Sequence, residues 1–417
     1  MELIRLNKYL PIALLYFFFN GLFLPLGLLY TTLLTPFFIV WLYKFPSFRY
    51  LLLFFLVTIP FALVHFIHGV DIISYVKSYL LLFSAFVFCV AFYQFLLVCN
   101  SLAILFKNIV LINFLFVLIA IILFFIPFFK DLVWYKNSIT NGVEAAYRLR
   151  LFTYEASYYS FLLAPIAIYY YLKILFIRAQ DKWFTFFIIT LPLILSLSFG
   201  VISAILLTFI FLLCSDLKLL YINKKLPTFI LFTILFFIIF LVAVIYFFPD
   251  NIVFIRIENI FKGRDTSFSG RTFDSIYLGW KIAAQKSILF GAGPGQIKIV
   301  GIDLFSKFYQ TSFSSDQLAI PNNIGDILAQ YGLIGITIKL FLEIYFFFKT
   351  KVYSNIYRLS LFLFVFIYQF SGSFINNIAE YVIWIMAFYS ALFPEFNKIN
   401  LFLKDDGNDL IHTPLLN

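Results

Sequence analysis

Charge is scarce in this sequence. Of its 417 residues only 12% are Asp, Glu, Lys or Arg, whereas 63% are hydrophobic. Soluble proteins have about a quarter of their residues charged, and they cannot bury this much apolar surface. The composition therefore excludes a soluble protein and predicts an all-α integral membrane protein.

Cysteine and histidine are also rare, with three residues of each. Cys89, Cys99 and Cys214 lie in or beside apolar segments, which predicts burial as small hydrophobic side chains rather than a disulfide or a metal site. His65 and His68 have no cluster of carboxylates or cysteines nearby. We therefore expect no metal and no other cofactor. Without a basic region interleaved with aromatics, we expect no nucleic-acid partner.

Long apolar runs fill most of the chain. A helix that crosses a bilayer needs about 20 apolar residues, and we predict twelve spans in one polytopic domain over 1–417. The segment 183–215 is too long for a single span, so we expect two short helices with a hinge at 196–200. If it were one long tilted helix, the count would be eleven spans. The spans are expected near 9–24, 26–43, 50–68, 77–98, 105–128, 157–176, 183–197, 199–215, 226–248, 324–348, 357–375 and 378–396.

The positions of Lys and Arg predict the orientation. With twelve spans, most basic residues lie in segments on the side of the N-terminus, and the short loops opposite hold at most Lys77. Cytoplasmic loops are the ones enriched in Lys and Arg. We therefore expect both termini in the cytoplasm, with 397–417 as a cytoplasmic tail.

Two long outer loops, 130–156 and 249–323, carry basic residues against this rule. Long loops cross a membrane regardless of charge, which accounts for the second loop better than the first. An anionic ligand at the outer face would account for both. The polar residues of the chain concentrate in 249–323, so chemistry at the membrane surface is favoured over a simple pore.

The first loop ends in Arg148, Arg150 and Glu155, directly before a predicted span. Arginine suits phosphate because its planar guanidinium is always charged and binds two oxygens at once. The alternative is an interfacial anchor, in which Arg and Tyr lie at the lipid headgroups.

The second loop contains an amphipathic helix, expected over 272–288, with Trp280 facing lipid or protein. Gly291, Gly293 and Gly295 follow it. Since no strand precedes them and no Gly-Lys-Ser/Thr follows, a helix stop and tight turn is favoured over a phosphate-binding loop.

The segment after this turn leads back into the membrane. Asp326 and Gln330 are four residues apart, so they are expected to share a helix face near the outer end of a span. Polar groups at that depth face protein or a water-filled cavity rather than lipid.

In this order and spacing, the segments resemble the bacterial O-antigen polymerase/O-antigen ligase family of membrane glycosyltransferases. The matching parts are 269–271, the amphipathic helix, 289–295, Asn322 and 329–335, and 148–159 resembles a segment of polysaccharide repeat-unit polymerases. The sequence departs from the family pattern at Ala156, Phe199, Ile288 and Pro321. Pro321 stands where ligases typically carry a histidine, which favours the polymerase branch.

The resemblance implies a metal-independent polymerase in the bacterial plasma (inner) membrane. It would join undecaprenyl-pyrophosphate-linked oligosaccharide repeat units into a surface polysaccharide, O-antigen, capsule or exopolysaccharide. Expected partners are these glycans, the lipid bilayer and a chain-length regulator. Guanidinium groups would stabilise the departing pyrophosphate, and Glu155 would orient or deprotonate the acceptor hydroxyl. The expected catalytic residues are Arg148, Arg150, Glu155 and Arg271, and the expected substrate-binding residues are Arg264, Gly291, Gly293, Gly295, Asn322, Asp326 and Gln330.

Other functions remain open. A ligase would transfer the glycan to lipid A core or to protein. A flippase or transporter of the same lipid-linked sugars would carry charges inside many spans and show repeat symmetry. Lys339, Glu343 and Glu380 are nearly the only charges within the predicted spans, which disfavours transport. A scaffold without chemistry is the remaining alternative.

Overall fold

The computed structural model describes residues 10–25, 28–99, 101–137, 146–177, 181–215, 258–259, 262, 266–315 and 318–403. Within these ranges the protein is almost entirely helical, and five helices are long and apolar enough to cross a membrane. The prediction of a helical membrane protein is confirmed at this level. The span expected at 226–248 lies outside the described residues, as does Arg264.

The most buried helix of the first half is α8 (Ala156–Phe176), which is buried over most of its length. The others are α1 (Leu10–Phe17), α2 (Tyr30–Leu33), α3 (Thr35–Leu42), α4 (Tyr50–Ile67), α5 (Ile72–Val98), α6 (Leu102–Phe124), α7 (Pro127–Val133), β1 (Trp134–Asn137), β2 (Ala146–Leu149), α9 (Lys182–Leu195) and α10 (Phe199–Ser215).

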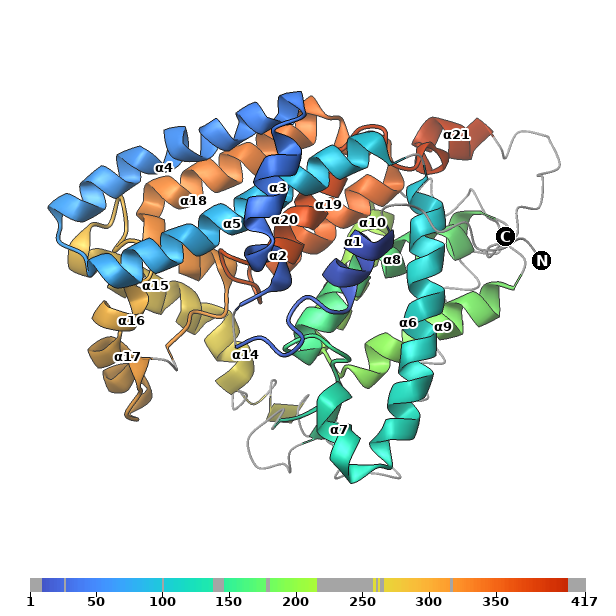
Figure 1. The fold of residues 1–417 in the computed structure, drawn as a ribbon, viewed down its shortest axis with the longest axis horizontal. Coiled ribbons are helices and arrows are strands. Elements are labelled where there is room, and N and C mark those ends of the chain that lie inside the picture. Colours follow the sequence, from blue (N-terminus) through green and yellow to red (C-terminus); the bar gives the residue numbers. More distant parts are fainter. Residues whose placement is uncertain are drawn as a thin grey trace.

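The elements of the second half divide into two groups. Four short helices belong to the second outer loop: α14 (Thr266–Arg271), α15 (Phe273–Lys286), α16 (Ile297–Val300) and α17 (Ile302–Tyr309). The remainder return to the apolar body: α18 (Asn323–Lys349), α19 (Ile356–Tyr368), α20 (Ile378–Phe388) and α21 (Lys398–Leu403). In Figure 1, α14–α17 lie together below the first half of α18. Phe61 of α4 contacts Tyr331 in that half, with ring centroids 5.3 Å apart.

Some predicted boundaries hold and others do not. The helices expected over 357–375 and 378–396 end early, at Tyr368 and Phe388. The hinge at 196–200 is confirmed, because α9 ends at Leu195, α10 begins at Phe199, and Leu197 between them has a positive φ of 46°. The helix expected over 9–24 ends at Phe17, and Phe23 turns the chain with a φ of 59°. The helix expected over 26–43 is divided between α2 and α3.

The first outer loop is folded where it is described. α7 leads into β1, which pairs antiparallel with β2 and places Tyr135 opposite Arg148. Trp134 Nε1 donates a hydrogen bond to the carbonyl of Ala120 at 2.8 Å, which fixes this hairpin to the end of α6. The loop therefore presents Arg148 from a strand rather than from a free segment.

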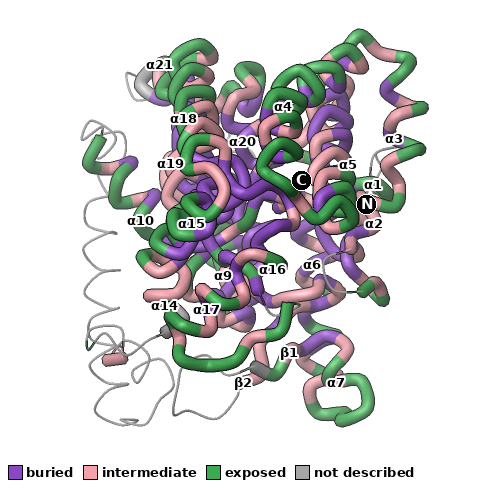
Figure 2. Tube along the Cα trace, turned by 90° about the vertical axis from the view of Figure 1, so that its left-hand side faces the viewer, coloured by how far each residue is buried: buried purple, intermediate pink, exposed green. Residues whose placement is uncertain are grey.

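The helix expected over 272–288 is α15, and its two faces differ as an amphipathic helix requires. Leu278 and Ile282 are buried against α18, whereas Tyr277 and Trp280 are exposed. In Figure 2 the buried residues gather between α18, α19 and α20, and exposed residues line the outer side of α15 and most of α4. Together with its neighbours, the buried face of α15 forms a small second core of Leu278, Ile282, Ala292, Ile297, Phe305, Leu318, Ile320 and Ala329.

Candidate functional site

A break in α18 organises the second outer loop. Gly332 has φ 65° and ψ −162°, values that interrupt a helix. The backbone after α15 replaces the lost helical hydrogen bonds. Ala292 N donates to Ala329 O at 2.8 Å, and Leu333 N donates to Ile288 O at 3.0 Å. Two further bonds of the same kind join 289 to 334 and 293 to 330. The first half of α18 is therefore held in place by the loop that precedes it in sequence.

The glycine-rich turn fills this break. Gly291, Gly293 and Gly295 all have positive φ, which is easiest for glycine. The expected helix stop and tight turn are confirmed. The N–H of Gly291 donates to Ser287 O and that of Gly293 to Gln330 O, so neither is free for a phosphate. Substrate binding by these glycines stays a prediction. Their backbone has a structural role, because it forms the turn that packs against the break in α18.

The first turn of α18 joins three segments of the chain. Asn322 caps the helix by accepting a hydrogen bond from Gly325 N at 3.0 Å. Its Nδ2 donates to the carbonyls of Arg271, at 2.8 Å, and Phe370. Capping residues such as Asn satisfy the free N–H groups of a helix start. Here the same side chain also ties α14 to the end of α19.

Asp326 and Gln330 share a face of α18, as predicted. Gln330 Nε2 donates to Asp326 Oδ1 at 2.6 Å, and Ile375 N donates to Asp326 Oδ2 at 2.9 Å. Both side chains are buried. They hold the segment between α19 and α20, so their contribution to substrate binding is an untested prediction.

Residues from both outer loops lie within electrostatic range of Tyr368, the last residue of α19. Its phenol interacts electrostatically with the side chains of Arg271, Glu155, Glu380 and Arg148. Tyr368 is buried and stacks on Phe161 of α8, with ring centroids 4.5 Å apart. Three of the four expected catalytic residues are therefore close enough to Tyr368 to act on its phenol electrostatically. Tyr368 lies in an apolar run, and no sequence signal marked it as a site residue.

Different local contacts position Arg148 and Glu155. Arg148 extends from β2 and donates from Nε to Ser196 O, at 3.0 Å, in the α9–α10 hinge. Glu155 occupies the N-cap of α8, and its Oε1 accepts a hydrogen bond from Ser157 Oγ. Both side chains are partly exposed, which leaves them accessible to a ligand.

Arg150, the fourth expected catalytic residue, is occupied differently. Its guanidinium donates to the carbonyls of Asp131, at 2.8 Å, and Tyr154, at 3.4 Å. Burial lowers the pKa of Arg150, and the nearby Tyr135 and Asp131 oppose this effect. The side chain braces the loop that leads to Glu155, a positioning role that the sequence pattern did not distinguish from direct contact with a ligand.

The described residues contain no group of three or more His, Cys, Asp and Glu side chains that could hold a metal. His65 links three segments instead. Its Nδ1 lies 3.1 Å from the hydroxyl of Tyr75, and its Nε2 lies 2.7 Å from the carbonyl oxygen of Phe290. His68 is exposed, whereas His65 is buried.

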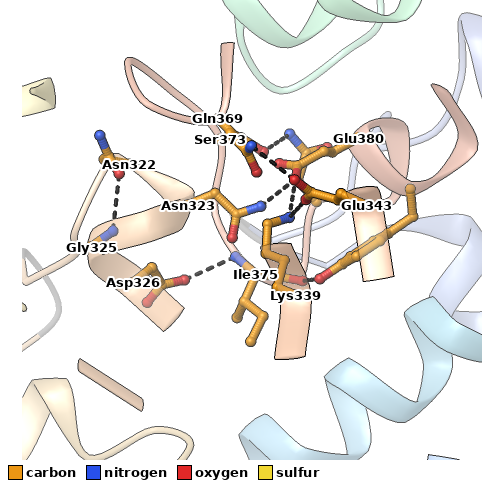
Figure 3. Close-up of polar contacts among 12 residues, drawn as sticks. Asn322, Asn323, Gly325, Asp326, Lys339, Glu343, Gln369, Ser373, Ile375 and Glu380 are labelled. Carbon is orange, nitrogen blue, oxygen red and sulfur yellow. Dashed lines mark hydrogen bonds and ion pairs between the residues drawn. The ribbon is translucent and has the colours of Figure 1, made fainter. Parts of the chain in front are cut away.

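The three charges that seemed isolated in the sequence form one buried cluster (Figure 3). Lys339 Nζ lies 2.9 Å from Glu380 Oε1 and 3.1 Å from Glu343 Oε1. Gln369 Nε2 donates to Glu343 Oε2 at 3.1 Å, and Asn323 Nδ2 donates to Glu380 Oε1. The cluster joins both halves of α18 to the end of α19 and to α20. It lies beside the first turn of α18, where Asn322 binds the carbonyl of Arg271.

No protein-family model matches this chain, and no curated protein matches it.

Proposed function

We propose that the protein is a metal-independent membrane glycosyltransferase that polymerises undecaprenyl-pyrophosphate-linked repeat units into a surface polysaccharide. The observation that carries this proposal is the gathering of Arg148, Glu155 and Arg271 around Tyr368. Two guanidinium groups and one carboxylate in a partly buried site provide what a glycosyl transfer from a pyrophosphate needs: charge stabilisation for the leaving group and a base for the acceptor.

In the proposed reaction, a hydroxyl oxygen of one lipid-linked glycan attacks the anomeric carbon of another. The bond from that carbon to the pyrophosphate oxygen breaks, and its electron pair leaves with the pyrophosphate. Arg148 and Arg271 stabilise the negative charge that develops there. Glu155 accepts the proton of the attacking hydroxyl. Arg150 holds the carbonyl of Tyr154 and so positions the residue that follows it.

The proposal includes twelve spans, an outer loop over 249–323 and both termini in the cytoplasm of a bacterium. This topology places α14–α17 and the site at the outer face of the plasma membrane, where lipid-linked glycans are presented. Single cysteines replacing exposed Lys281 and exposed Lys351 test it in a variant without native cysteines. A membrane-impermeant maleimide is expected to label position 281 in intact cells and position 351 only after lysis. The reverse pattern would contradict the topology.

The decisive test uses purified protein and purified lipid-linked repeat units. Wild-type protein is expected to convert them to a ladder of polymers, also in EDTA. Arg148→Ala and Arg271→Ala are expected to abolish the ladder at unchanged protein level, and Glu155→Gln to reduce it strongly. Lys281→Ala removes an exposed cation of the same loop and serves as the matched control. Normal ladders from both arginine variants would refute the site.

Gene deletion separates polymerase from ligase. Loss of a polymerase leaves single repeat units attached to the final acceptor, whereas loss of a ligase leaves none attached. The first result is expected here.

Transport of lipid-linked sugars is the second candidate, and the buried charge cluster favours it. Charged side chains inside membrane spans often mark an ion or substrate pathway. Proteoliposomes containing a fluorescent lipid-linked sugar test this function directly. Protein-dependent movement across the bilayer that is lost in Lys339→Met, without polymer formation, would replace the polymerase proposal.

A further inference from the structure

The charge balance of the buried cluster is uneven. Lys339 supplies one ammonium group to two carboxylates, those of Glu343 and Glu380. Glu380 is 0% exposed and Glu343 is 5% exposed. With both carboxyl groups ionised, the cluster would carry one uncompensated negative charge. Buried charge without a partner is strongly unfavourable, so one positive charge is missing from the arrangement.

The groups that face the cluster do not supply that charge. From α18, Asp326 interacts with Glu380 and adds a third acid. From α19 and α20, Tyr368 and Tyr381 interact electrostatically with Glu380, and the Tyr381 hydroxyl donates to Ile375 O at 2.7 Å. The Trp384 ring lies 6.0 Å from Lys339 Nζ. In the described part of the chain, Lys339 is the one cation in direct contact with either carboxylate.

Unpaired acceptors are a second, independent observation. Glu380 Oε2, Gln369 Oε1 and Asn323 Oδ1 are buried without a hydrogen-bond partner among the described residues. Gln369 and Asn323 are both fully buried, and both direct their amide nitrogens to the two carboxylates. These three atoms are acceptors, as is Glu343 Oε1, which has only the ion pair with Lys339; Trp384 Nε1 is a buried donor without a partner among the described residues. A protonated carboxyl group offers a donor that an ionised one lacks.

We propose that Glu343 and Glu380 together bind one exchangeable proton at neutral pH. Two carboxyl groups on one ammonium titrate as a unit, so the proton belongs to the pair. One proton neutralises the single excess charge, whereas a divalent cation would leave an excess positive charge. This inference rests on the buried cluster alone and does not depend on the proposed glycosyl transfer.

The proton site is connected mechanically to the residues around Tyr368. Glu380 accepts a hydrogen bond from Asn323, whose backbone N donates to Gly372 O at 3.2 Å. The preceding residue, Asn322, holds the carbonyl of Arg271. Loss of the proton places an additional negative charge beside Asn323. The first turn of α18 and the Arg271 backbone are the segments expected to respond.

Infrared spectroscopy of the full-length protein in lipid nanodiscs detects the proton directly. A protonated carboxyl group gives a C=O stretch that is distinct from the carboxylate bands and shifts in D₂O. Wild type is expected to show the band of this pair at neutral pH and to lose it on alkaline titration. Glu343→Gln and Glu380→Gln are each expected to remove it, because the remaining carboxylate then pairs with Lys339. Lys339→Met is expected to double the band, because both carboxyl groups then lack a counterion and both become protonated.

Two controls locate the band. Glu395→Gln changes a carboxyl group outside the cluster and is expected to leave the band intact, as is Asp326→Asn. Loss of the band only in Asp326→Asn would place the proton there and overturn the proposal. Absence of the band at neutral pH, or its appearance only after Na⁺ is removed, would also overturn it. Size-exclusion profiles of each Glu→Gln variant establish that the protein is folded when the spectra are compared.

Discussion

Gly279 of α15 and Gly325 of α18 lie in backbone contact. A Cβ at position 279 would lie 2.4 Å from the carbonyl oxygen of Gly325, and one at position 325 would lie 2.5 Å from the carbonyl oxygen of Ser275. No side chain fits between these helices at their crossing. The outer loop is thereby fixed to the helix whose first turn carries Asn322.

Gly279→Ala is expected to loosen this crossing. The added methyl meets backbone, which cannot move aside cheaply, and overpacking of this kind typically costs about 1–3 kcal/mol. Hydrogen exchange of 273–286 is expected to accelerate, and the melting temperature to fall. Gly270→Ala is the matched control, since its nearest contact would be Tyr309 Oη at an ordinary 3.6 Å. Equal behaviour of the two variants would count against the contact.

Gly332→Ala and Gly69→Ala separate backbone strain from crowding. Both glycines have positive φ, 65° and 73°, where an L-residue costs about 1–2 kcal/mol. A Cβ at 69 meets nothing within 4 Å, whereas one at 332 would lie 2.5 Å from Gly291 N. Gly332→Ala is therefore expected to destabilise the protein clearly more in thermal denaturation. Similar losses of stability in the two variants would show that crowding at position 332 adds nothing to backbone strain.

Lys339→Met is expected to destabilise the folded protein by about 3–5 kcal/mol at neutral pH, because it leaves two buried carboxyl groups without a counterion. Its stability is expected to rise as pH falls, since protonation neutralises both acids. The triple variant Lys339→Met, Glu343→Gln, Glu380→Gln removes all three charges and is expected to recover much of the loss. Melting curves over a pH series measure both effects, and a pH-independent Lys339→Met variant would contradict this account.

Tyr368→Phe tests the residue that the structure adds to the site. Removing one hydroxyl preserves the ring stacking on Phe161 and removes the phenol that interacts electrostatically with Arg271, Glu155 and Arg148. Polymer formation is expected to slow by about tenfold, which corresponds to a loss of ~1.4 kcal/mol of transition-state stabilisation. Tyr170→Phe changes another buried tyrosine and is expected to keep full activity. Equal rates for both variants would remove Tyr368 from the site.

High pH is expected to weaken the α17 unit. Burial, reinforced by the charge of Asp274, raises the pKa of Tyr309 from its ordinary value of 10.0 to about 12. Between these values the unfolded chain releases the phenolic proton while the folded chain keeps it, so stability falls as pH rises. Below that window this group has no effect. Tyr309→Phe is expected to flatten the decline in hydrogen-exchange protection of 302–309, and an unchanged slope would exclude Tyr309 as its cause.

Composition and local signals predicted much of the architecture. Apolar runs of sufficient length identified the long helices, because a helix satisfies its own backbone wherever water is excluded. Ser196 and its neighbours marked the hinge between α9 and α10. The basic residues in both outer loops predicted a shared anionic ligand, which stays a prediction; Arg148 and Arg271 both interact electrostatically with Tyr368.

Contacts between distant segments could not be predicted in this way. Gly332 lies in a run that reads as continuous helix, and only the docking of 288–293 shows why it breaks there. Lys339 and Glu380 are far apart in sequence, so their pairing depends on how α18 and α20 pack. The sequence around Arg150 does not distinguish its role from that of Arg148. The roles differ because the guanidinium of Arg150 donates hydrogen bonds to two backbone carbonyls.

The broken helix has a consequence for biosynthesis. α18 cannot complete its own backbone hydrogen bonds at Gly332 and takes partners from 288–293, a segment that leaves the ribosome earlier. The segment 288–293 must therefore be in place before α18 can complete its backbone hydrogen bonds. The helices around this segment act as an assembly template for the helix that follows them in the chain.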